Sequence, residues 1–125
     1  MSREDRGQGG ILLASAARTA SVNSPAVTNV CGGQNLEVII NCSADPASAS
    51  VVFTIQGFDA GSQTWFDILA SAAVNATGQR ILRVSPHLTA SANLIAKDIV
   101  PRIFRVEAVA ADSDSLTYSV AYSLT

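Results

Sequence analysis

The sequence predicts an all-β protein, an antiparallel β-sandwich or jelly-roll-like barrel of seven or eight strands with an extended N-terminal arm. Segments of alternating apolar and polar residues follow one another along the chain, and short runs of turn-forming residues separate them. Of the 125 residues, 48% are hydrophobic and 14% are charged, a composition that supplies one buried core and is atypical of disordered chains. We therefore expect an arm over residues 1–20 and a β-sandwich domain over residues 21–125.

The expected arm differs in composition from the rest of the chain. It joins the polar, glycine-rich MSREDRGQGG to the small apolar ILLASAARTA, and neither half has a helix cap or a sustained period. Such an arm is expected to be loose in the free protein and to become ordered when it binds a partner. Its candidate partner-binding residues are Arg3, Arg6, Ile11, Leu12, Leu13 and Arg18.

The first strands of the expected domain are LEVIINC and VVFTIQGFD, joined by the turn SADPAS. Both alternate, so that one face of each strand is apolar, although Ile39 is an apolar exception on the polar face. Gly57, near the end of the second strand, permits a bulge or the close approach of another segment. The residues expected to face the core are Leu36, Val38, Ile40, Cys42, Val51, Phe53 and Ile55.

The remaining strands are separated by clear turn signals. Residues 59–62 form a hairpin-type turn into TWFDILAS, and residues 75–78 turn the chain into RILRVSP. PRIFRVEAVA and LTYSVAYSL complete the set, and between Pro86 and Pro101 we expect a short helix that starts near residues 89–91. The core-facing residues of this part are Phe104, Val106, Ala108, Leu116, Tyr118, Val120, Tyr122 and Leu124, with Leu94 and Ile95 of the helix tucked inward.

Charge and hydropathy limit the classes of partner that we expect. Eight Lys and Arg against ten Asp and Glu give a net charge of -2 with no basic run, so no nucleic acid partner is expected. No apolar run approaches the roughly 18 residues that span a bilayer, and Arg3 to Arg6 do not form a positive signal-peptide region. We expect a chain made in the cytoplasm with no membrane partner. The two cysteines, Cys31 and Cys42, could by their number form one disulfide, but a protein made in the cytosol is expected to keep its thiols free.

Residues suited to catalysis or metal binding are few. His87 is the sole imidazole, so at most one nucleophile–base triad is available, and no local motif supports it. We expect His87 to cap a loop or to face solvent. One histidine and two separated cysteines do not match a zinc site, and Asp112 and Asp114 lack the spacing of a calcium loop. The sequence predicts no enzyme, no catalytic, cofactor-binding or metal-binding residue, and no cofactor.

Trp65 and its neighbour Phe66 leave two interpretations open. Exposed aromatic rings stack on sugars, which would make this pair a carbohydrate platform. More often, such neighbours on one strand place one ring in the core and the other at an edge or an interface. Trp65 and His87 complete the set of candidate partner-binding residues.

An ordered series of motifs runs through most of the chain. It comprises TIQGFD, Trp65 before Ile68 and Leu69, ATG at residues 76–78, LRVSPHL at 82–88, PRIFRV at 101–106 and LTYSV at 116–120. In this series, over about residues 20–124, the chain resembles small β-sandwich virion structural proteins of tailed bacteriophages, of the head decoration or cement type. It departs from them in the Cys31–Gly33 turn and in its longer N-terminal arm.

The resemblance implies a place in the virion and a set of partners. A protein of this type binds the outer surface of the head and stabilises the contacts between capsid subunits. Its partners would be the major capsid protein and further copies of itself, as a dimer or a trimer. The alternatives are a neck or tail structural protein, or a host-surface or carbohydrate-binding module on the virion.

Overall fold

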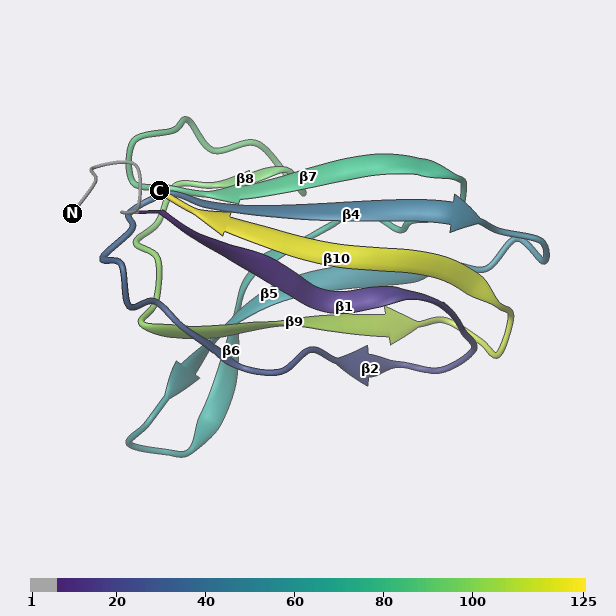
Figure 1. Cartoon of the computed structure of the whole chain (residues 1–125), viewed down its shortest axis with the longest axis horizontal. Coiled ribbons are helices and arrows are strands. Elements are labelled where there is room, and N and C mark those ends of the chain that lie inside the picture. The colour runs from purple at the N-terminus through teal and green to yellow at the C-terminus, as the bar shows by residue number, and fades with distance from the viewer. Residues whose placement is uncertain (1–6) are drawn as a thin grey trace.

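The computed structural model describes residues 7–125, which form ten β-strands and no helix (Figure 1). The predicted β-sandwich is confirmed, because these strands build two sheets that lie face to face. Seven strands have seven or more residues and three have only two. The strands are β1 (Gln8–Arg18), β2 (Val22–Asn23), β3 (Val27–Thr28), β4 (Leu36–Ala44), β5 (Val51–Asp59), β6 (Thr64–Ala70), β7 (Gly78–Val84), β8 (Ile95–Ala96), β9 (Ile103–Ala110) and β10 (Leu116–Leu124).

The two sheets have different strand orders. Sheet A runs β1-β10-β4-β7-β8, and sheet B runs β2-β9-β5-β6 with β3 also paired to β9. All pairs are antiparallel except β7 with β8. The chain passes from sheet A to sheet B between β1 and β2, so this connection closes one side of the sandwich (Figure 1).

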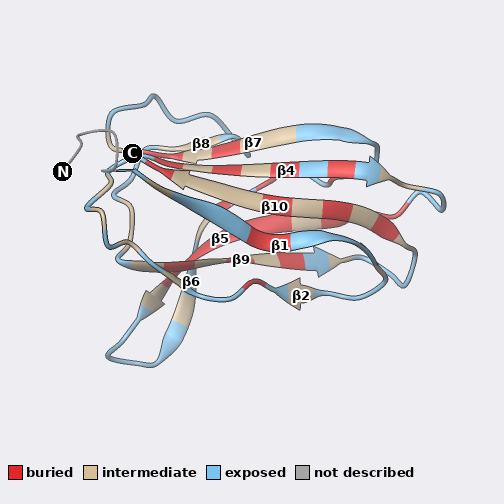
Figure 2. Cartoon of the chain, in the orientation of Figure 1, coloured by how far each residue is buried: buried red, intermediate tan, exposed pale blue. Residues whose placement is uncertain are grey.

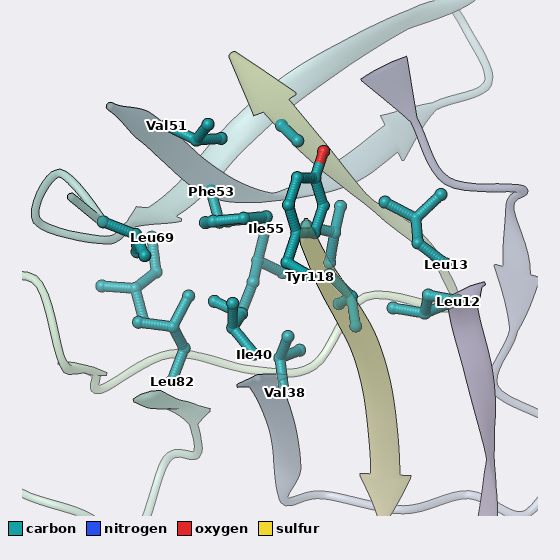
Figure 3. Close-up of a cluster of buried hydrophobic side chains, with 14 of the residues drawn as sticks. Leu12, Leu13, Val38, Ile40, Val51, Phe53, Ile55, Leu69, Leu82 and Tyr118 are labelled. Atoms are coloured by element: carbon teal, nitrogen blue, oxygen red, sulfur yellow. The ribbon is translucent and has the colours of Figure 1, made fainter. Parts of the chain in front are cut away.

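The core lies between the sheets, and Figure 2 shows buried residues alternating with less buried ones along β4 and β10. At its centre the rings of Phe53 and Tyr118 meet edge to face with centroids 4.9 Å apart (Figure 3), a favoured geometry for aromatic pairs. The alternation therefore predicted the core strands correctly, except that Tyr122 is only half-buried. The confirmed core residues are Leu36, Val38, Ile40, Cys42, Val51, Phe53, Ile55, Phe104, Val106, Ala108, Leu116, Tyr118, Val120 and Leu124.

The predicted N-terminal arm over residues 1–20 is wrong for the part that the structure describes. Residues Gln8–Arg18 form β1, which pairs with β10 along its whole length. Register shifts on either side of Leu13 turn both Leu12 and Leu13 into the core. A bulge places two consecutive residues on one face and so removes the period of two that marks a strand. The sandwich begins at Gln8 instead of at residue 21.

The helix expected between Pro86 and Pro101 is also wrong. The segment consists of turns and the short strand β8, and Leu94 is 50% exposed. The carbonyls of Leu94 and Ala96 accept hydrogen bonds from the backbone N–H groups of Arg83 and Ser85. The segment thus extends the edge of sheet A, and Asn93, with φ of 63°, adopts a conformation that interrupts a right-handed helix.

The two cysteines are both free thiols. Cys42 is buried on β4, where burial raises the pKa of its thiol. Cys31 is half-buried in the turn before β4. Among residues 7–125, no helix has the length and apolar character needed to cross a membrane.

Candidate partner-binding surfaces

The candidate residues of β1 have different environments. Ile11 is 74% exposed, whereas Leu12 and Leu13 are buried in the core (Figure 3). The prediction that Leu12 and Leu13 bind a partner is therefore wrong, since both are used by the sandwich itself. Arg3 and Arg6 lie outside the described residues.

Arg18, at the end of β1, is engaged within its own chain. Its guanidinium donates hydrogen bonds to the carbonyls of Tyr118 at 2.8 Å and Ala14 at 2.6 Å. It also lies 4.7 Å from the centre of the Tyr118 ring. Burial raises the pKa of Tyr118, and the charge of Arg18 counteracts part of that rise. Arg18 thus fastens β1 to β10.

Trp65 lies on β6, in the hairpin that extends away from the two layers in Figure 1. Its ring is half-buried, with the ring of Phe58 at 4.9 Å and the guanidinium of Arg105 at 4.3 Å. The neighbouring ring of Phe66 covers Gly57, where an added Cβ would lie 2.5 Å from Phe66 Cζ. The predicted close approach at Gly57 is confirmed. Neither ring of the Trp65–Phe66 pair reaches the core, since Phe66 remains 48% exposed.

A polar network surrounds Gln56 beside Trp65. Arg105 Nε donates to Gln56 Oε1 at 2.8 Å, and Gln56 Nε2 donates to Asp67 Oδ1 at 2.8 Å and to Glu107 Oε1 at 3.5 Å. Gln56 is only 6% exposed although it lies on the outer face of sheet B. The network joins β5, β6 and β9, and the sequence indicates none of it beyond the alternation along VVFTIQGFD, which places Gln56 on the face opposite Phe53 and Ile55.

The turn of the same hairpin is held by Asp59. Its carboxylate accepts hydrogen bonds from the backbone N–H of Gly61 at 3.0 Å and from Ser62 Oγ at 2.7 Å. These bonds, that of Ser62 above all, hold the pKa of Asp59 below the ordinary aspartate value. The turn predicted over residues 59–62 is confirmed.

His87 belongs to the loop between β7 and β8. Its Nε2 lies 2.8 Å from Gln34 Oε1, and its backbone N–H donates to Ser85 Oγ at 3.1 Å. Ser85 in turn donates to Asn35 Oδ1 at 2.6 Å. The ring therefore links the β7–β8 loop to the β3–β4 loop, which matches the loop-capping role expected for it.

These loops belong to one end of the sandwich, which we call the loop end and define as residues 29–35, 85–88 and 97–101. Three hollows of about 390, 360 and 200 Å³ open there, and the first is lined by the ion-paired Glu37 and Arg83 as well as by loop residues. Large apolar side chains from all three loops are exposed at this end, namely Val30 at 75%, Leu88 at 36% and Ile99 at 73%.

The structure does not assemble the predicted residues into one site. Ile11 and Arg18 lie on the β1 edge, Trp65 lies on the hairpin of sheet B, and His87 lies at the loop end. In the described part of the chain, no three His, Cys, Asp or Glu side chains form a group that could hold a metal ion.

Comparison with known proteins gives a likeness of fold. No family model matches the sequence, and no curated protein matches it. Among solved structures, the chain is similar to the SPBc2 prophage-derived protein YomS, with a TM-score of 0.51 and 10% identity over 94% of this chain and 92% of that one. A structure of infectious bursal disease virus, Gx strain, aligns over 96% of this chain and 33% of that one, at 12% identity and a TM-score of 0.39. The first likeness shows that this chain and YomS share a fold.

Proposed function

We propose that the protein is a structural component of a bacteriophage virion, and that it is a decoration or cement protein on the outer surface of the head. The observation that carries this proposal is the fold shared with a prophage-derived protein over 94% of this chain and 92% of the other. The ordered motif series from TIQGFD to LTYSV agrees with it. The proposed role is binding, not catalysis, and the proposed partners are the major capsid protein and further copies of the chain.

The architecture suits a cement role because such a protein must carry load across a seam between subunits. Strand β1 is paired with β10 and fastened by Arg18, so the described N-terminal segment belongs to a stiff body. Attachment by an arm that becomes ordered on binding is therefore not favoured for residues 8–18. A preformed surface costs less conformational entropy on binding than a disordered segment does.

The loop end is the proposed attachment surface. It combines three exposed apolar side chains with hollows that suit the projecting side chains of a partner. Interface cores are typically formed by apolar anchors that fill pockets, surrounded by polar groups such as His87 and Gln34 here. We therefore assign the contact with the major capsid protein to this end.

The experiment is co-sedimentation of the protein with mature heads that lack it, scored as copies bound per head and as resistance of the heads to heat. Hundreds of copies with raised heat resistance are expected. Ile99→Asp at the loop end should weaken binding at least about tenfold, because it places a charge in a contact core. Val109→Asp, an exposed valine on the outer face of sheet B, is the matched control and should bind normally.

Other outcomes would redirect the proposal. Saturation at about six or twelve copies would indicate a neck or tail position, because those structures have low rotational symmetry. Absence of binding would overturn the head assignment. A host-surface or carbohydrate-binding role predicts that glycans bind the isolated protein and that Trp65→Ala abolishes this binding, but Arg105 already lies over the Trp65 ring.

A further inference from the structure

The outer face of sheet A carries a row of apolar side chains that the strand register aligns. Ile11 of β1 is opposite Ala121 of β10, Ala121 is opposite Ile39 of β4, and Ile39 is opposite Ile81 of β7. We call Ile11, Ala121, Ile39 and Ile81 the apolar row. It crosses four neighbouring strands on the side that points away from the core, and Ile11 is 74% exposed.

The surroundings of the apolar row are polar, and their charge is balanced. On one side lie Ser119, Asn41 and Gln79, and on the other lie Ser123, Glu37 and Arg83. Glu37 and Arg83 form an ion pair at 3.3 Å, so the two charges offset each other within the chain. A face with an apolar centre and a polar margin has the composition of a protein interface.

We propose that this face packs against the same face of a second copy of the chain, across a two-fold axis parallel to the strands and midway between β10 and β4. This axis places the small Ala121 opposite Ile39 of the partner subunit, and Ile11 opposite Ile81 of the partner subunit. Large side chains then meet small ones at the centre, as complementary packing requires. The contact is self-complementary, which a two-fold interface demands.

The same axis avoids electrostatic conflict. It brings the Glu37 and Arg83 pair over the partner subunit's Ser123 and the partner's Gly9, so no like charges meet. Each ionised group retains its ion-pair partner inside its own chain. Burial of a charge without a partner would oppose association, and this arrangement involves none.

The dimensions of the face suit a dimer. Strands lie about 4.8 Å apart and rise about 3.4 Å per residue, so four strands of about nine residues give a flat footprint on the order of 600 Å². The relief of the side chains adds to this area. A stable interface buries roughly 800 Å² per partner. The proposal does not depend on the virion role, because it rests on the outer face of sheet A alone.

The test is sedimentation velocity of the purified full chain over about 1–100 µM, a range in which a micromolar dimer dissociates on dilution. The wild type should shift from monomer to dimer within this range. Ala121→Glu and Ile39→Thr should both weaken dimerisation, the former at least about tenfold, because it brings a charge to the centre of the contact. Val109→Glu, on the outer face of sheet B, is the matched control and should behave as the wild type does.

Thermal unfolding of each variant shows that it is folded, and Ile39→Thr keeps a β-branched residue on the strand in case Ala121→Glu does not fold. The proposal is overturned if the wild type stays monomeric at every concentration, if it forms a trimer, or if the dimer persists unchanged in the folded variants. Equal weakening by Val109→Glu would also contradict it. A dimer that fails to bind phage heads would leave this inference intact and oppose the proposed function.

Discussion

The outer faces of the two sheets differ in how they use their side chains. On sheet B, Arg105 donates a hydrogen bond to Gln56 and stacks on Trp65, and Gln56 donates to the carboxylates of its neighbours on β6 and β9. On sheet A, the register aligns the apolar row across four strands, Ile11 in it is 74% exposed, and the Glu37–Arg83 ion pair is partly exposed. The difference indicates that sheet B's outer face stabilises the fold, whereas that of sheet A is available for association.

The largest effect is expected from Gln56→Ala. The substitution removes hydrogen bonds to one cation and two carboxylates at a nearly buried position. The free energy of unfolding should fall by about 2–3 kcal/mol, as measured by urea denaturation. Gln79→Ala, the same change on the outer face of sheet A, should alter it by no more than about 0.5 kcal/mol. Equal losses would show that side chains on the two outer faces contribute equally to the free energy of unfolding.

Arg105→Lys should have the next largest effect. Lysine keeps the charge but loses the planar stack on Trp65 and the Nε hydrogen bond to Gln56. A loss of about 1–2 kcal/mol in the free energy of unfolding is expected. Because Trp65 is the sole tryptophan, its emission reports the same site directly. Unchanged stability and emission would mean that the stacking contributes nothing.

Glu37→Gln, on the outer face of sheet A, should have a smaller effect. Both side chains of the Glu37–Arg83 pair are about two-fifths exposed, at 39% and 43%. Exposed ion pairs contribute little, so unfolding should become easier by no more than about 0.5 kcal/mol. The difference in the free energy of unfolding between the wild type and Glu37→Gln should vanish at about 1 M salt, where charges are screened. A loss as large as that of Gln56→Ala would place this pair among the principal stabilising contacts.

Asp59, in the hairpin turn of sheet B, should have the smallest effect, because its carboxylate is fully exposed. Its pKa is lowered in the folded state, so it stabilises the fold above the unfolded aspartate pKa and ceases to do so as the pH falls through the folded pKa. The melting temperature of the wild type should therefore fall more steeply below about pH 4 than that of Asp59→Asn. Parallel pH profiles of the two proteins would contradict this.

Much of the fold follows from the sequence because a sheet with one buried face imposes a period of two. This holds for β4, β9 and β10, whose inward residues were predicted individually. It fails at β1, where Leu12 and Leu13 are both buried across a bulge. It fails again near Leu94, because an apolar residue in a loop and one in a short helix look alike when the backbone partners are unknown.

The surfaces were less predictable because they depend on which strands are neighbours. Gln56 looks like an ordinary solvent-facing residue until β6 and β9 are placed on either side of β5. Ile39 is an apolar exception on the polar face of its strand, but only the register shows that Ile11 and Ile81 lie in the same row. His87 lies in a loop, as predicted, but the interpretation that places one ring of the Trp65–Phe66 pair in the core is wrong.

The pairing of β1 with β10 sets an order of events during synthesis. Gln8 has Leu124 as its partner, so β1 pairs with a strand that leaves the ribosome after the eight strands between them. Until β10 emerges, the Leu12–Leu13 pair has no core to enter, and β4 lacks a neighbour on one side. Long-range pairing of this kind slows folding and prolongs the exposure of apolar segments. Sheet A can therefore close only after β10 has been made, whereas the β5–β6 hairpin can form as soon as its own two strands are made.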